Sequence, residues 1–267
     1  MPSQPWVLSR EMFLSVDEAA RLLDSLAAAE AAAPDQTAPA VDRVLIETLL
    51  LSGIKNSEFC RLSLADVTLS GLAPEKSPGL AKAPTVPQAA GPTGLLRVES
   101  SPTERREVVI PARLTTLLDR YLRDVRPRLK HTAFTPRDPA GPLVPNERGN
   151  PFDRTALYRR VVRVLSAHGL GDKAGVQLLR HTYGYLAYLG TGGNLLFVQR
   201  QLGHAHPMVT AVYAEFVDFD PKRLANAVVP VAPILPTVDE RPSTESAPHL
   251  DQVPTSPPRP RRKGAPS

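Results

Sequence analysis

The sequence holds little of what disulfides, secretion and membrane insertion require. Cys60 is the single cysteine among 267 residues, so an internal disulfide is excluded and a reducing compartment is the simplest interpretation. The first residues lack a basic stretch followed by an apolar run, and no apolar run approaches the roughly 20 residues of a membrane-spanning helix. We therefore expect a cytoplasmic protein without a signal peptide and without membrane contact.

Aromatic residues are also scarce, at 5% of the chain, whereas proline is abundant with 29 residues. Hydrophobic residues still make up 42%, which is enough for a sizeable core without covalent staples. This balance predicts a folded core with Pro-rich irregular segments rather than full disorder. We expect an N-terminal extension over residues 1–11, a domain over 12–230 with a Pro/Ala/Gly-rich insert at 71–94, and a disordered tail over 231–267.

Local signals predict a mainly α-helical protein with one small antiparallel β ribbon, an α+β fold. Ser15 and Glu18 have the spacing of a helix-capping box, Asp42 is a candidate cap of the next helix, and Gly53 is a candidate stop. Apolar segments on both sides of residues 101–105 predict a two-stranded ribbon. We expect helices at about 16–32, 42–51, 58–62, 112–126, 153–168, 177–189, 194–202 and 207–216, and a short one from 220.

Charge is distributed unevenly along the chain, whose net charge is +5 with an isoelectric point near 9.5. Residues 1–50 hold 3 basic and 8 acidic side chains, a net of −5, whereas residues 105–163 hold 14 basic and 6 acidic ones, a net of +8. A basic middle beside an acidic start favours a positive face for a polyanion such as nucleic acid. An ordinary solvated surface is the alternative, and charge alone does not decide between them.

The helix predicted after Asp153 has one apolar face and one arginine face. Its apolar stripe consists of Leu157, Val161, Val164 and Leu165. The arginines off that stripe are Arg154, Arg159, Arg160 and Arg163. Such a helix is suited to lie on a core with one side and to contact phosphates with the other.

Residues 177–216 hold the side chains best suited to phosphate chemistry. Gln177 and Arg180 lie one turn apart on one face of a predicted helix. His204 follows a Gly-ended turn, and Tyr213 comes nine residues later. An arginine fork matches two phosphate oxygens, a histidine donates a further hydrogen bond, and a tyrosine hydroxyl can attack to give a covalent intermediate. Spacing alone does not establish that these groups converge.

Three motifs resemble the conserved boxes of the tyrosine recombinases, also called the phage integrase family. The family pattern G-[LIF]-R-x-S-E-L followed by L-x-x-x-D is similar to GIKNSEFCRLSLAD at 53–66. The pattern H-x-L-R-H-[TS] is similar to QLLRHT at 177–182, and L-G-H with a tyrosine nine residues later matches residues 202–204 and Tyr213. The resemblance runs from about residue 12 to 230, and chance agreement at so many fixed positions is improbable.

The resemblance implies the catalytic-domain fold of this family and DNA recombination or integration without metal or cofactor. Tyr213 would attack a DNA phosphate and leave a 3′-phosphotyrosine bond and a free 5′-hydroxyl, while Arg180 and His204 would stabilise the oxyanions. A metal cluster of His181, His204 and His206 is a poor alternative, because it lacks a cysteine partner and a helical His-x3-His pair. The implied partners are double-stranded DNA, further copies of the chain docked partly through the helix after Asp220, and a partner recombinase where one exists.

Three groups depart from the family pattern. Lys55 stands at the first arginine position, Gln177 at the first His or Lys position of the second box, and Arg105 or Arg106 nearest to the missing ribbon lysine. Lysine keeps the charge but loses the bidentate fork, and arginine is a poor general acid because its pKa exceeds about 12. We predict a catalytic set of Tyr213, Arg180, His204, Lys55, Gln177 and Arg106. The predicted DNA contacts are Arg105, Arg154, Arg159, Arg160, Arg163 and His181.

These departures keep other functions open. The second hypothesis is a family member that binds DNA, cleaves it slowly or not at all, and acts as an accessory or regulatory subunit. A third is a helical transcription regulator that uses the arginine helix. Covalent trapping on a nicked DNA substrate separates the first hypothesis from both of these.

Overall fold

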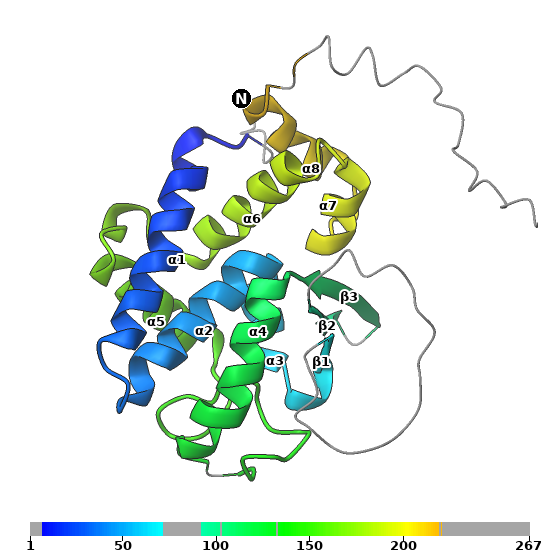
Figure 1. The fold of residues 1–267 in the computed structure, drawn as a ribbon. Helices are drawn as coiled ribbons and strands as arrows, with labels where there is room; N and C mark the ends of the chain where they lie inside the picture. The colour runs from blue at the N-terminus through cyan, green and yellow to red at the C-terminus, as the bar shows by residue number, and fades with distance from the viewer. Residues whose placement is uncertain (1–6, 72–91, 102, 132, 219, 221–267) are drawn as a thin grey trace, which may run out of the picture. The chain divides into compact units, whose positions relative to one another are not determined.

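The computed structural model of the chain describes residues 7–71, 92–101, 103–131, 133–218 and 220, all in its first compact unit (Figure 1). The helices of these ranges are α1 (Val16–Ala31), α2 (Thr37–Ser52), α3 (Asn56–Arg61), α4 (Ala112–Arg120), α5 (Arg154–Ala167), α6 (Val176–Gly190), α7 (Leu195–Leu202) and α8 (Met208–Ala211). The 3-10 turns are η1 (Arg10–Met12), η2 (Leu64–Asp66), η4 (Arg126–Arg128), η5 (Gly171–Lys173) and η6 (Val212–Phe216), and η3 (Tyr121–Val125) is a π-helical turn. The strands are β1 (Val67–Ser70), β2 (Thr93–Ser101) and β3 (Glu104–Ile110). The predicted class, mainly helical with a small antiparallel sheet, is confirmed.

Helix α2 lies at the centre of the main hydrophobic core. Most of its side chains are buried, among them Leu45, Ile46 and Leu50. Helices α1 and α6 pack on it (Figure 1), and α4, α5 and β3 contact it as well. A helix that is apolar on nearly all sides has to be covered on all sides. Helix α2 therefore supports both α6 and the turn at Gly53 that follows it.

The three strands form one antiparallel sheet in the order β1–β2–β3. Strands β2 and β3 are the predicted ribbon, with Val98 opposite Arg106 and Glu99 opposite Arg105. Because side chains alternate along a strand, Arg106 shares a face with the buried Val108, whereas Arg105 lies on the exposed side. Local signals did not predict β1, which is only four residues long.

Two predicted helix boundaries are wrong, and tertiary contacts explain both. Helix α2 begins at Thr37, so Asp42 does not cap it. Asp42 instead lies inside the helix, where its carboxylate pairs with Arg160 at 2.5 Å. The long helix predicted as far as residue 126 is α-helical only through α4, because the π and 3-10 turns that follow carry Arg126 into the interior.

Some expectations fall outside the described residues. They concern most of the insert at 71–94, the short helix expected after Asp220, and the tail over 231–267.

The capping box predicted at Ser15 lies within the described ranges and is confirmed. The Ser15 hydroxyl accepts a hydrogen bond from the Glu18 amide at 3.1 Å, and the Glu18 carboxylate accepts one from the Ser15 amide at 2.7 Å.

Ion pairs join the acidic N-terminal helices to the basic middle of the chain. Glu47, fully buried in α2, pairs with Arg113 at 2.9 Å, and Glu30 of α1 pairs with Arg120 at 2.6 Å. Each pair neutralises one negative charge of the N-terminal helices and one positive charge of residues 105–163. The net charge of +8 over residues 105–163 therefore overstates the positive surface that a polyanion can meet.

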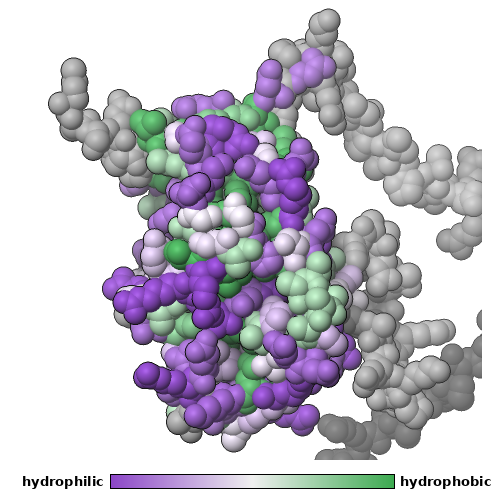
Figure 2. All heavy atoms as spheres, turned by 90° about the vertical axis from the view of Figure 1, so that its left-hand side faces the viewer, coloured by the Kyte–Doolittle hydropathy of each residue, from purple (hydrophilic) through white to green (hydrophobic). Residues whose placement is uncertain are grey.

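The face on the α1 side of this unit is covered mostly by hydrophilic residues, with hydrophobic ones in separate areas (Figure 2). Scattered exposed apolar side chains are normal on a protein surface. None of the helices in the described ranges is long and apolar enough to cross a membrane.

Candidate active site

A second, smaller hydrophobic cluster lies beside the main core and includes one of the residues that the motifs singled out. Phe13, Tyr183, Val198 and Leu202 form it together with Tyr213. These side chains come from the segment after η1, from α6 and α7, and from η6. Helix α6 packs on α2 and also on α7 and η6, so it brings the sequence motifs into one place.

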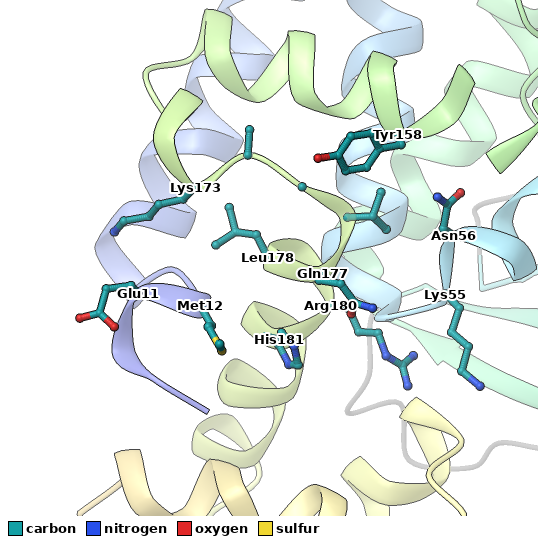
Figure 3. A pocket seen from close by; sticks show the side chains of 13 residues that line it. Glu11, Met12, Lys55, Asn56, Tyr158, Lys173, Gln177, Leu178, Arg180 and His181 are labelled. Carbon is teal, nitrogen blue, oxygen red and sulfur yellow. The ribbon is translucent and has the colours of Figure 1, made fainter. Parts of the chain in front are cut away.

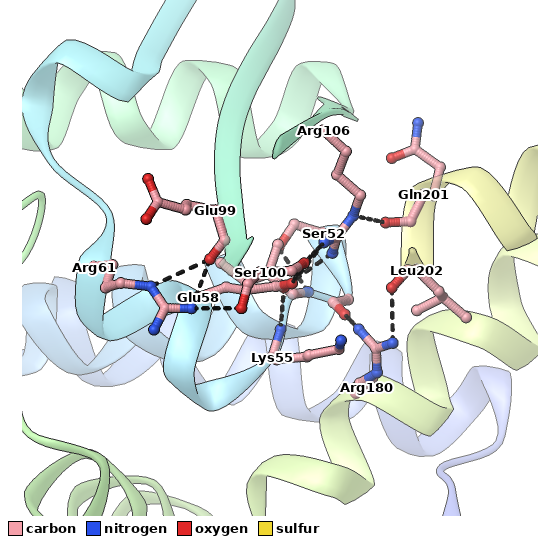
Figure 4. A network of polar contacts seen from close by, with 12 residues as sticks. Ser52, Lys55, Glu58, Arg61, Glu99, Ser100, Arg106, Arg180, Gln201 and Leu202 are labelled. Atoms are coloured by element: carbon pink, nitrogen blue, oxygen red, sulfur yellow. Dashed lines mark hydrogen bonds and ion pairs between the residues drawn. The ribbon is translucent and has the colours of Figure 1, made fainter. Parts of the chain in front are cut away.

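Arg180 is buried on α6 and is held by two backbone carbonyls. Its Nη1 donates to the Gly53 carbonyl at 2.5 Å, and its Nη2 donates to the Leu202 carbonyl at 2.8 Å (Figure 4). These bonds tie the turn after α2 to the end of α7. Burial lowers the pKa of Arg180, and the carboxylate of Glu58 partly offsets that effect. The guanidinium stays charged, and its other N–H groups are left for a ligand.

His204 follows the turn that ends α7. Gly203 closes this helix with a φ of +66°, a left-handed conformation that favours glycine. A Cβ at Gly203 would also lie 2.9 Å from the guanidinium of Arg106. Nδ1 of His204 shares a 2.8 Å hydrogen bond with Thr210 Oγ1, which leaves Nε2 for another partner. Burial and then the positive charge of Arg180 lower the pKa of His204 to about 4, so the ring is neutral at pH 7.

Tyr213 lies in η6 with 1% of its surface exposed. Its ring packs directly on α6, where a Cβ at Gly184 would come within 2.2 Å of the tyrosine Cζ. The hydroxyl shares a 3.2 Å hydrogen bond with Nδ1 of His181. Burial raises the pKa of Tyr213 to about 12, although the charge of Arg180 acts in the opposite direction. The hydroxyl is therefore protonated at pH 7 and is held against α6.

The variant Gly184→Ala is expected to displace Tyr213. The added methyl group would overlap the tyrosine ring at 2.2 Å, and overpacking of this kind costs about 1–3 kcal/mol. Thermal unfolding should show a lower melting temperature. The matched control is Gly190→Ala on the same helix, where a Cβ meets nothing within 4 Å. Equal melting temperatures for the two variants would contradict the close packing of Tyr213 on α6.

Arg106 reaches from β3 toward the site, but the protein itself uses its donors (Figure 4). Its Nη1 and Nη2 donate to the two carboxylate oxygens of Glu58 at 2.5 and 2.9 Å, Nη1 donates also to Ser100, and Nε donates to the Gln201 carbonyl. Burial acts to raise the pKa of Glu58, yet the hydrogen bonds from Arg106, Ser100 and the Lys55 amide outweigh it and lower that pKa to about 2. Arg106 thus joins β3 to α3 and to the end of α7.

A cavity of about 730 Å³ opens beside Arg180. Lys55, Gln177 and His181 line it together with Arg180 (Figure 3). The side chains of Lys55 and Arg180 point the same way in Figure 3, and Lys55 is exposed at the start of α3. Gln177 is exposed at the start of α6, one turn before His181. The lining of the cavity holds three cations, one carboxylate and a neutral amide, which are Lys55, Lys173, Arg180, Glu11 and Gln177.

The five arginines predicted to contact DNA differ in how available they are. Arg160 is only 10% exposed and pairs with Asp42 at 2.5 Å and with Glu147 at 2.6 Å. It therefore braces α5 against α2 and is not free for a phosphate. The exposed ones are Arg105, Arg154, Arg159 and Arg163.

Three contacts of the site were not predicted from the sequence. Glu58 was taken only as part of a motif, and Thr210 was not singled out. His181 was predicted only as a DNA contact, and the hydrogen bond of its ring to the Tyr213 hydroxyl was not predicted. The sequence signal available for His181 was its spacing from Gln177, which places both residues on one face of the helix that also carries Arg180. In the part of the chain that the structure describes, no group of three or more His, Cys, Asp or Glu is arranged to hold a metal ion.

Comparison with known proteins finds relatives in sequence, although no protein family model matches the chain. The chain is similar to the tyrosine recombinase XerC of Thermodesulfovibrio yellowstonii, with 28% identity over 201 residues that make up 75% of this chain and 56% of the relative. It is also similar to the tyrosine recombinase XerH of Helicobacter pylori, with 25% identity over 218 residues, 80% of this chain and 50% of the relative. The chain thus spans about half the length of these curated relatives.

Solved structures share the fold. A XerH site-specific recombinase in a pre-cleavage complex with its difH substrate matches with a TM-score of 0.57 at 25% identity, covering 81% of this chain and 53% of that one. XerA recombinase matches in fold with a TM-score of 0.53 at 22% identity, covering 85% of this chain and 65% of that one. In both cases the similarity covers most of this chain and only part of a longer protein.

Proposed function

The chain is similar in sequence and in fold to the tyrosine recombinases, and from this premise we propose that it cuts and rejoins DNA at specific sites. The step would link Tyr213 covalently to a 3′-phosphate. The observation that carries the proposal is the position of Arg180, which binds the end of α7 just before His204 and is next in sequence to His181, whose ring bonds the Tyr213 hydroxyl. Arg180 lies close enough to influence the pKa values of both other side chains, and it binds the carbonyl two residues before His204.

The contacts of these residues allow a division of roles. The Tyr213 oxygen forms a bond to phosphorus, the bond from phosphorus to the 5′-oxygen breaks, and the departing 5′-oxygen takes a proton from water. Arg180 and Lys55 neutralise the non-bridging oxygens. If Thr210 donates to Nδ1 of His204, Nε2 carries a hydrogen and donates to the phosphate. A 5′-hydroxyl then attacks the phosphotyrosine and restores the DNA backbone, so no high-energy cofactor is consumed.

Departure of the 5′-oxygen is the weak point of this site. Arg106 is bonded to Glu58 and is a poor proton donor. Gln177 has an amide that does not titrate. These two features favour the second candidate, a DNA-binding chain with slow or absent cleavage that serves as an accessory subunit.

Covalent trapping on a nicked substrate tests the proposal. The DNA is selected for binding to this chain, and one version carries sulfur at the 5′-bridging position, because a thiolate leaves without needing a proton. We expect a protein–DNA adduct, with more of it on the sulfur substrate than on normal DNA. No adduct on either substrate, alone or with a partner recombinase, would refute strand cleavage and leave the accessory role.

DNA binding should depend strongly on salt, because the exposed arginines of α5 would meet phosphates. The logarithm of affinity falls with the logarithm of salt concentration by about 0.9 per neutralised phosphate. Replacing the exposed Arg154 and Arg159 together with glutamine should reduce that slope by about 2 × 0.9. Arg120→Gln is the control, because Arg120 already pairs with Glu30, and its slope should equal that of the wild type. An unchanged slope for the double variant would remove α5 from the DNA interface.

The partners follow from the same proposal. Double-stranded DNA is the proposed substrate, and the similar XerH site-specific recombinase was solved in complex with its difH substrate. We propose further that copies of the chain assemble on DNA, with a partner recombinase where one exists, because rejoining of exchanged strands requires more than one cleaved site.

A further inference from the structure

We propose that His181 is the proton acceptor for Tyr213, a catalytic role beyond phosphate binding. The inference rests on the proposed function. As the Tyr213 oxygen bonds to phosphorus, its hydrogen passes to Nδ1 of His181. In the rejoining step the imidazolium returns that proton to the tyrosine oxygen as the bond to phosphorus breaks.

The geometry of the pair is fixed from two sides. The Tyr213 hydroxyl and Nδ1 of His181 are 3.2 Å apart, within reach of proton transfer. The tyrosine ring lies directly over Gly184, one turn further along the same helix. The hydrogen bond therefore joins two side chains that lie on the same face of α6.

Other groups near the hydroxyl are unsuited to accept its proton. Nδ1 of His204 is engaged by Thr210 at 2.8 Å, and its Nε2 is assigned to the phosphate. Arg180 carries a proton already. The Glu58 carboxylate is taken by Arg106. Gln177, one turn before His181, has an amide that does not take a proton in water. His181 is therefore the basic group among the described residues that touches the hydroxyl.

The ring of His181 is open to solvent through the cavity beside Arg180. His181 lines the cavity of about 730 Å³ beside Arg180 (Figure 3), so the ring can exchange its proton with solvent after each step. Arg180, Tyr213 and His204 interact with His181. The other charged and titratable side chains that line its cavity are Lys55, Lys173, Glu11 and Tyr158. Burial and then Arg180 lower the pKa of His181, so the ring is a neutral base at pH 7.

Transfer has to accompany the attack on phosphorus. The pKa of Tyr213 is raised to about 12 and that of His181 is lowered from 6.5, so a resting tyrosinate beside an imidazolium is strongly disfavoured. As the bond to phosphorus forms, the phenol becomes much more acidic, and the bound phosphate favours the imidazolium. The base is thus matched to the transition state rather than to the resting enzyme.

The test uses the 5′-sulfur substrate, so that protonation of the leaving group does not limit the rate. In His181→Asn the amide nitrogen or oxygen can replace the hydrogen bond of Nδ1 but does not take a proton. We expect single-turnover adduct formation to slow by about 10² to 10⁴, with DNA binding unchanged. His206→Asn, an exposed histidine in the turn after α7, is the control and should keep the wild-type rate. If His181→Asn also keeps that rate, His181 only positions Tyr213 and the proposal is overturned.

Two further readouts separate proton transfer from a structural role. Added imidazole should restore part of the rate in His181→Ala and have no effect on the wild type. The wild-type rate of adduct formation should fall as the pH drops through the lowered pKa of His181, and it should stay level above that pKa. In the His181 variants the rate should instead rise about tenfold per pH unit toward the Tyr213 pKa of about 12, because only the ionised tyrosine then reacts. If the variants do not fold, the wild-type profile decides alone, and a rate that rises throughout with pH overturns the proposal. Absence of any wild-type adduct would instead refute the proposed function itself.

Discussion

Tyr213→Phe is expected to form no covalent adduct with DNA, on normal or on 5′-sulfur substrate. The variant lacks the oxygen that would bond to phosphorus, and no general base or better leaving group replaces it. It should still fold, because one neutral hydrogen bond to His181 is worth only about 1 kcal/mol. DNA binding should persist because it depends mainly on charged contacts with phosphates.

The matched control is Tyr183→Phe. Tyr183 belongs to the same hydrophobic cluster, is also buried, and has a pKa raised by burial to about 12. Its variant should trap DNA as the wild type does. An adduct formed by Tyr213→Phe would assign the nucleophile elsewhere, and peptide mapping of the adduct would identify it.

The parts of the fold that could be predicted depend on neighbours in sequence. The cap at Ser15 and the stops at Gly53 and Gly203 involve bonds within a few residues, so the sequence reveals them. Arg180 and Tyr213 were predicted for a related reason, since each stands in a short motif. Their proximity through the packing of η6 on α6 was expected only from the resemblance.

The parts that could not be predicted depend on partners far apart in the chain. Arg106 pairs with Glu58 across 48 positions, and Asp42 meets Arg160 across 118. Local signals made Asp42 a helix cap, and the family resemblance made Arg106 a candidate catalytic group. The net charge of the basic middle overstated its positive surface for the same reason, because Glu30 and other acidic residues pair with arginines of that region within the fold.

Glu58→Gln is expected to be the most destabilising single change at this site. The Glu58 side chain has no exposed surface, and its carboxylate accepts from both ends of the Arg106 guanidinium. The amide would leave a nearly buried charge without its partner, which typically costs about 3–5 kcal/mol. Urea unfolding should show this as a lower midpoint. Arg105→Gln is the control, because its pair with Glu99 is exposed and is worth about 0–1 kcal/mol.

The stabilisation that Glu58 contributes should depend on pH in a defined direction. The pKa of Glu58 is lowered from 4.5 to about 2 in the folded protein, so the folded state favours the charged form. Its stabilisation is complete above about pH 4.5 and is lost as pH falls toward 2. At about 1.4 kcal/mol per pKa unit, this amounts to about 3 kcal/mol. The difference in unfolding free energy between the wild type and Glu58→Gln should therefore become smaller in acid. A difference that stays constant from pH 7 to pH 2 would show that the charge of the Glu58 carboxylate does not stabilise the packing of β3 on α3.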